Sequence, residues 1–146
     1  MKTENDKPEW LKIAEKELGT KEIPGDKDNP RIIEYHKATV LKGEHDEIPW
    51  CSAFVNWCIM KAGLIQTRSS VARSWLTWGE EIKDPIIGCI VVLKRGTKSW
   101  QGHVGFWVGK NQILGGNQSN SVTIAKFSDA DVLGYRWPGK KETRKK

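Results

Sequence analysis

The apolar segment after Pro49 constrains the fold of this chain more than any other feature of its sequence. Pro49 favours extended backbone in the residue before it. Apolar residues with helical spacing follow, at positions 51, 54, 55, 58 and 62, and Gly63 ends the pattern. We therefore predict a buried helix that begins at or next to Cys51. Unpaired amides and the positive end of the helix dipole favour a thiolate there, which makes Cys51 a candidate nucleophile.

Helical patterns occupy the first half of the chain and strand patterns the second half. Helices are expected from about residue 8 to 18, from Asn29-Pro30 onward, over 51–62 and over 71–76. Short β-branched runs separated by turn residues then follow, at 88–93, 102–109, 112–114, 122–125 and 132–137. Helices followed by closely spaced strands are typical of the α+β class. We predict N-terminal helices packed on a C-terminal antiparallel sheet, arranged as a meander.

Length and charge indicate one folded domain with a basic end. A chain of 146 residues suits a single domain, which we assign to residues 1–138. Residues 139–146 are expected to be a basic, solvated tail. The net charge of +6 points to polyanionic surroundings, such as nucleic acid, an anionic membrane or an anionic cell wall. No nucleic-acid reader motif is present and the basic excess lies at the C-terminal end, so a specific nucleic-acid partner is not expected.

The cysteines and the N-terminus bear on the cellular compartment. The three cysteines, at 51, 58 and 89, form no CxxC pair, so the sequence predicts neither a disulfide framework nor a thiol-rich zinc site. A reducing compartment is expected. The N-terminus has no apolar segment typical of a signal peptide, and no apolar run reaches membrane-spanning length. Action outside the cytoplasm would then require assisted export.

A cysteine nucleophile needs a base, and His103 is the best candidate. It opens a predicted strand in which Gly105 removes a neighbouring side chain, and we expect this gap to let the helix with Cys51 approach. His36 and His45 are expected to be structural or exposed. A zinc site from His45, Cys51 and His103 is an alternative, but its spacing matches no closed zinc pattern. No metal or other cofactor is therefore predicted.

A third polar side chain is expected to orient the imidazole through its far nitrogen. A tight turn at 109–111 would bring the next strand back, which places Asn117 near the level of His103. From spacing alone, Asn117 fits a turn-forming role equally well. Gln118 and Asn120 remain alternatives for the third position.

Eight tryptophans are more than a core of this size requires. Large core fillers are expected to account for half of them or more. Trp50, Trp75 and Trp107 are our candidates for the walls of a substrate groove, with core packing as the alternative for each.

Four blocks of the sequence carry a family resemblance, in order Pro49–Trp57, Gly88–Val92, Gly102–Phe106 and Leu114–Gln118. Together they resemble the NlpC/P60 and CHAP superfamily of papain-like cysteine peptidoglycan hydrolases, with a likeness to its compact phage endolysin-type members. The resemblance covers roughly residues 10–138 and implies a papain-like core. Matched to this chain, it implies Cys51 as nucleophile, His103 as base and Asn117 as third residue. It also implies an oxyanion hole that includes the backbone N–H of Cys51.

The resemblance implies that an endopeptidase or amidase hydrolyses an amide bond of the peptidoglycan stem peptide without a cofactor. The compact size, the lack of a signal-peptide segment and the basic tail lead us to expect a monomeric, bacteriolytic and antimicrobial enzyme, made in a host cytoplasm and acting on the wall after assisted export. The basic tail would contact the anionic envelope. A bacterial effector delivered by a dedicated machine would have a similar sequence. A cell-wall-binding module without turnover, and a papain-like acyltransferase or deamidase, are the alternatives, and the bond cleaved depends on groove walls that the sequence does not place.

Overall fold

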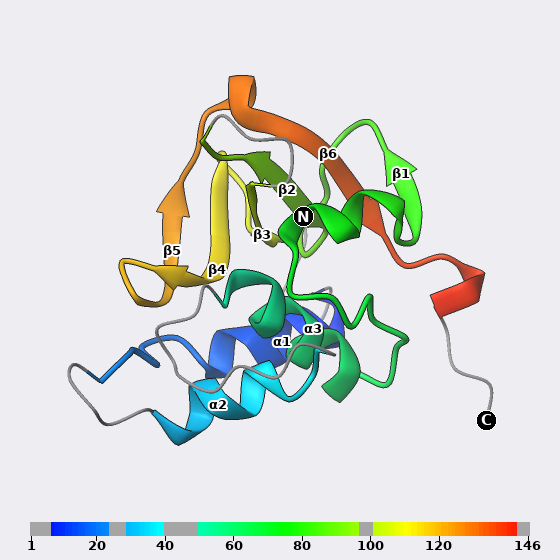
Figure 1. The fold of residues 1–146 in the computed structure, drawn as a ribbon. Helices are drawn as coiled ribbons and strands as arrows, with labels where there is room; N and C mark the ends of the chain where they lie inside the picture. The colour runs from blue at the N-terminus through cyan, green and yellow to red at the C-terminus, as the bar shows by residue number, and fades with distance from the viewer. Residues whose placement is uncertain (1–6, 24–28, 40–49, 97–100, 143–146) are drawn as a thin grey trace.

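A helical layer and a six-stranded antiparallel sheet make up the described part of the chain, which comprises residues 7–23, 29–39, 50–96 and 101–142 of the computed structural model. The α-helices are α1 (Glu9–Lys16), α2 (Pro30–His36) and α3 (Cys51–Lys61). The strands are β1 (Glu80–Ile82), β2 (Ile90–Lys94), β3 (Gly102–Trp107), β4 (Gln112–Gln118), β5 (Ser121–Lys126) and β6 (Val132–Trp137). The helices lie together on one side of the sheet (Figure 1). The predicted α+β class, with helices before antiparallel strands, is confirmed.

The strand order is β1-β6-β2-β3-β4-β5, so only part of the sheet is a meander. Strands β2 to β5 follow one another as neighbours, as predicted. Strand β6 then returns to pair with the other edge of β2, and β1 pairs with β6. The segment expected to be a helix over 71–76 is a 3-10 helix, η2 (Ala72–Thr77). Its side chains still pack into the core, because Ala72 and Trp75 are buried.

Local sequence explains where the helices begin and end. The side chain of Asn29 accepts a hydrogen bond from the Arg31 amide, and Pro30 occupies the first helical position of α2. Helix α3 ends before Gly63, whose φ of +85° suits glycine, and the Leu64 amide donates to the Ile59 carbonyl. Both predicted boundaries are therefore confirmed.

Helix α3 is the centre of the core. Every residue from 51 to 59 is buried, so the predicted apolar stripe underestimates its burial. Tyr35 of α2 contacts it on one side, with ring centroids 5.1 Å from Phe54 and 5.2 Å from Trp57. The sheet covers another side, where Phe54 lies 6.4 Å from Phe106 of β3. A helix enclosed in this way has no solvent-facing side along most of its length.

The two faces of the sheet carry separate apolar clusters. Val92, Val104 and Phe106 belong to the main core with the helices. Val91, Leu93 and Ile113 form a second cluster on the outer face, against partly buried side chains that include Trp107 and Phe127. Successive residues of a strand point to opposite faces. His103 is paired with Leu93 across β2 and β3, so its side chain starts from the outer face.

The ordered chain continues past the expected end of the domain. Residues Lys140–Glu142 form a short 3-10 helix, η4. The Ile65 amide donates to the Glu142 carbonyl at 2.8 Å, and the Gly139 amide donates to the Glu142 side chain at 2.9 Å. Residues 139–142 therefore pack on the body of the protein, which differs from the solvated tail expected for them, and 143–146 lie outside the described residues. Within the described ranges, no helix combines the length and apolar character needed to span a bilayer.

Candidate active site

Cys51 is the first residue of α3 and is only 7 % exposed. Its thiol accepts a hydrogen bond from the backbone N–H of Val104 on β3. The Trp107 amide donates to the carbonyl of Cys89, just before β2, whereas the next amide, that of Val108, donates to Gln112 of β4. By this alternation, the even-numbered residues of β3 direct their amides toward β4. Strands β3 and β4 are paired only at Phe106–Leu114 and Trp107–Ile113. The Val104 amide is therefore available to the Cys51 thiol. Val104 is the residue that follows His103 in the chain.

Gly116 of β4 makes this close approach possible. A Cβ at Gly116 would lie 2.6 Å from the Trp50 ring and 2.8 Å from Phe54 Cβ, so only glycine lets α3 pack here. The prediction that Gly105 makes room for the helix is wrong. A Cβ at Gly105 would meet Ile113 Cγ1 at 2.6 Å, because residue 105 faces the outer side of the sheet.

His103 is 2 % exposed and is held by Gln118. His103 Nε2 lies 2.8 Å from Gln118 Oε1. The Gln118 amide nitrogen donates to the Thr123 carbonyl at 2.8 Å, which fixes Oε1 as the atom that faces the imidazole. Because Oε1 only accepts hydrogen bonds, we assign the imidazole proton to Nε2. Nδ1 then carries the lone pair, and it is buried without a hydrogen-bond partner in the described residues, as a base requires.

The side chain that contacts the imidazole is that of Gln118, one of the alternatives, and no contact of the imidazole with Asn117, the predicted third residue, is found among the described residues. The β4–β5 register shifts between Gly115 and Gln118, and Asn117 has a φ of +59°. This irregularity changes the side-chain alternation, so that Gln118 reaches the imidazole. A Cβ at Gly115 would lie 3.0 Å from Gln118 Oε1 and 3.4 Å from His103 Nε2, so glycine leaves room for the pair. Asn120, the other alternative, is exposed and uses its carbonyl to accept the Glu22 amide.

Burial controls the protonation of the candidate pair. Burial raises the pKa of the Cys51 thiol, and the Val104 amide, Arg95 and the first amides of α3 offset part of this rise. Burial also lowers the pKa of His103 to about 4, an effect that the Gln118 hydrogen bond opposes and Arg95 increases. The resting pair is therefore a neutral thiol and a neutral imidazole. The thiolate expected from the helix position is not favoured, because desolvation outweighs the helix N-terminus.

Comparison with known proteins identifies the family. The family described as CHAP domain matches residues 43–125, which is more than half of the chain and includes Cys51, His103 and Gln118. The chain belongs to the CHAP domain family. A comparison with curated proteins finds no match. The predicted resemblance to the NlpC/P60 and CHAP superfamily is thus confirmed, and this superfamily is of the peptidoglycan hydrolase type.

A solved structure shows the same fold as this CHAP domain. It is a crystal structure of a protein from Staphylococcus aureus subsp. aureus Mu50, described as similar to a lipoprotein of the NLP/P60 family. The TM-score is 0.61 at 14 % sequence identity, over 95 % of this chain. The chain spans 43 % of the length of that protein. At this identity the likeness establishes the papain-like fold alone.

A buried polar network anchors the first turn of α3 in the CHAP domain. Ser52 Oγ donates to the Ser69 carbonyl at 2.7 Å and accepts from Trp75 Nε1 at 3.0 Å. Asn56 donates to the Ser69 carbonyl at 3.1 Å and accepts the Arg68 amide at 2.6 Å. This network fixes the backbone beside Cys51. Sequence reasoning missed it, although two polar residues four apart in an apolar helix are a signal for a buried network.

Two of the three tryptophans predicted to contact substrate are core residues. Trp50 and Trp75 are 0 % exposed, so the prediction is wrong for both. Each indole N–H has an internal acceptor, Glu22 Oε2 for Trp50 and Ser52 Oγ for Trp75. Trp107 is partly exposed on the outer face of the sheet, and its role as a groove wall remains a prediction.

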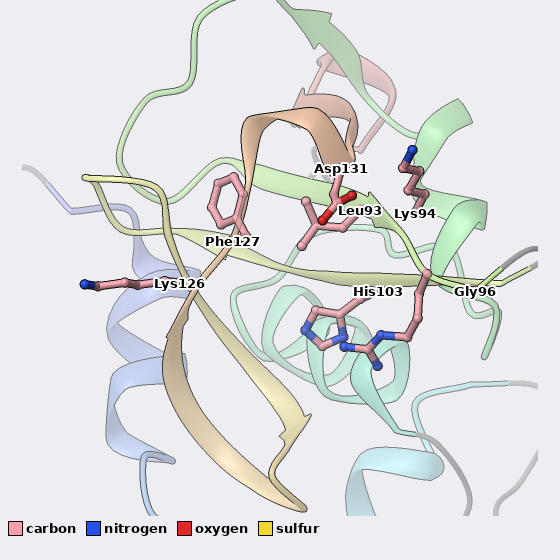
Figure 2. A pocket seen from close by; sticks show the side chains of 8 residues that line it. Leu93, Lys94, Gly96, His103, Lys126, Phe127 and Asp131 are labelled. Atoms are coloured by element: carbon pink, nitrogen blue, oxygen red, sulfur yellow. The ribbon is translucent and has the colours of Figure 1, made fainter.

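Cavities open beside His103 on the outer face of the sheet. One, of about 400 Å³, is lined by His103, Gln118, Arg95 and Lys126, among others. A neighbouring cavity adds Lys94 and Asp131 (Figure 2). Sequence reasoning did not single out Arg95, because one arginine in a basic chain gives no signal. Among the described residues, no group of three His, Cys, Asp or Glu side chains is placed to hold a metal ion, and His45 lies outside them.

Proposed function

We propose that this CHAP domain is a cysteine endopeptidase or amidase that hydrolyses an amide bond of the peptidoglycan stem peptide. The observations that carry the proposal are the contact of the Cys51 thiol with the amide of Val104, the residue after His103 in the chain, and an imidazole whose Nε2 is held by Gln118 while Nδ1 has no partner among the described residues. Membership of a family of the peptidoglycan hydrolase type supports the substrate class.

The neutral resting pair defines the order of proton transfers. His103 Nδ1 takes the proton of the Cys51 thiol as the sulfur attacks the amide carbonyl. The N–H at Nε2 keeps its hydrogen bond to Gln118 during this step. The backbone N–H of Cys51 is the proposed oxyanion donor, at the positive end of α3. The imidazolium then protonates the leaving amine as the C–N bond breaks and leaves a thioester on Cys51. Water, deprotonated by His103, hydrolyses the thioester and restores the thiol.

Mass spectrometry of digested sacculi tests this function. Wild-type protein should release fragments with new amino termini on the stem peptide, and these fragments name the bond. Cys51→Ala should release none. Cys58→Ala is the matched control, because Cys58 is buried in the same helix and should leave the products unchanged. Identical digests from the wild type and Cys51→Ala would exclude catalysis by Cys51 and favour a wall-binding module.

An added amine acceptor separates hydrolysis from acyl transfer. The site is nearly closed to solvent, with Cys51 at 7 % and His103 at 2 % exposure, and limited water access favours capture of the thioester by an amine. Hydrolysis gives a free carboxylate on the acyl fragment even when the amine is present. A product that carries the added amine would identify a transferase instead.

We further propose a monomeric, bacteriolytic enzyme of the endolysin kind, made in the cytoplasm and brought to the wall by assisted export. Delivery as a bacterial effector would use the same chemistry. The basic end would hold the enzyme on the anionic envelope. Removal of residues 143–146 alone spares the contact of Glu142 with Ile65, and should reduce lysis from outside at low salt but not at high salt. Equal lysis at both salt concentrations would exclude this role.

A further inference from the structure

The cavity beside His103 combines an apolar floor with cationic walls. Its floor includes Leu93 and Ile113, which are 8 % and 2 % exposed. Its walls include Arg95 and Lys126, and no described acidic residue lines it. With a volume of about 400 Å³, it can enclose a small branch of a ligand. Apolar surroundings strengthen the attraction between a bound anion and these cations.

Arg95 is the cation that acts on the candidate catalytic pair. Its positive charge lowers the pKa of both Cys51 and His103. In Figure 2, Lys94 and Lys126 both extend away from His103. Arg95 forms no hydrogen bond or ion pair within the described residues, although Asp131 lies in the neighbouring cavity. An arginine without a partner at a cavity wall has its planar donor fork available for a carboxylate.

We propose that Arg95 binds a carboxylate of the substrate in this cavity, so that the enzyme takes acidic peptides with a free carboxylate close to the scissile amide. This inference rests on the proposed function and specifies its substrate class. Stem peptides supply such a group, because a D-glutamate linked through its side chain keeps its α-carboxylate free.

A bound carboxylate would also assist the reaction itself. His103 must become positively charged when it takes the thiol proton, and the charge of Arg95 opposes this step. A carboxylate on Arg95 neutralises that charge and makes the imidazolium easier to form. The carboxylate should therefore raise kcat as well as lower KM.

A pair of peptides that differ in one group tests the inference. One is a stem peptide with a free α-carboxylate on its D-glutamate, and the other carries a carboxamide there. Wild-type protein should prefer the carboxylate by about ten- to hundredfold in kcat/KM, the range for a hydrogen bond to a charged group. Arg95→Gln should abolish the preference, mainly through a lower rate on the carboxylate peptide. Lys94→Gln removes the same charge from the neighbouring residue and should keep the preference.

Binding to the Cys51→Ala protein provides a second measurement that does not depend on turnover. By calorimetry, Cys51→Ala should bind the carboxylate peptide more tightly than the carboxamide, and adding Arg95→Gln should equalise the two. Equal affinities, or no binding of either peptide, would overturn the inference. Turnover of both peptides at equal kcat/KM would overturn it while leaving the proposed function intact. If the protein binds the carboxylate peptide more tightly than the carboxamide but wild type turns over neither, the proposed function would be overturned, while the inferred carboxylate-binding site would stand.

Discussion

Gln118 determines which nitrogen of His103 is free to act as the proposed base. Its amide nitrogen is engaged by the Thr123 carbonyl, so its oxygen accepts the Nε2 proton and leaves Nδ1 unprotonated. A neutral amide at this place holds the ring without adding negative charge. Burial keeps the pKa of His103 at about 4 against the opposing effect of the Gln118 hydrogen bond, so the imidazole is unprotonated over the neutral range.

Replacing Gln118 by glutamate should raise the pKa of His103. A carboxylate 2.8 Å from Nε2 stabilises the imidazolium, so the pKa should move upward from about 4. Since His103 must be unprotonated to accept the thiol proton, the acid limb of kcat/KM should shift to higher pH by the same amount. Histidine titration by NMR and the pH profile measure the two effects. Asn117→Asp adds the same charge one residue away and should shift the pKa of His103 and the acid limb less. Equal shifts in the two variants would mean that Gln118 does not contact the imidazole.

At the scale of elements, α3 packs closely against the sheet because Gly116 of β4 has no side chain. Gly116 brings the start of α3 close to the strand, while the Ser52 network ties it to the segment that contains Ser69. Both contacts lie within one helical turn of Cys51. Close packing and this hydrogen-bond network therefore fix the backbone at Cys51, the candidate nucleophile.

Gly116→Ala should displace α3 and destabilise the protein. The added methyl would lie 2.6 Å from the Trp50 ring, and overpacking of this kind costs about 1–3 kcal/mol. The free energy of unfolding in urea measures the cost, and kcat/KM should fall with it, because Cys51 moves with the helix. Gly134→Ala is the control, since its nearest contact is the flexible end of Leu76 at 3.1 Å. Equal stability of the two variants would show that α3 does not pack on Gly116.

For the whole molecule, local patterns in the sequence predicted most of the elements in order, but not the short strand β1, and they pointed to Cys51 and His103 as candidate reacting residues. Cys51 follows a clear helix start, and His103 opens a clear strand. The third residue depends on an irregular pairing between β4 and β5, which shifts register before Gln118, and no spacing rule reveals that shift. The prediction for Gly105 failed because the sequence does not show which face of β3 meets the helix, and residue 105 lies on the other face. The neutral state of Cys51 depended on burial, a property of the complete fold.

The most direct test of the central claim is the mass of the intact protein during turnover of a stem-peptide ester, which acylates faster than the amide. Wild type and Cys58→Ala should both gain the mass of one acyl group, located on Cys51 by peptide mapping. His103→Ala should acylate far more slowly, because no base takes the thiol proton. Product formation without an adduct on Cys51, or an adduct that forms equally fast in His103→Ala, would contradict the assignment of Cys51 and His103 as nucleophile and base.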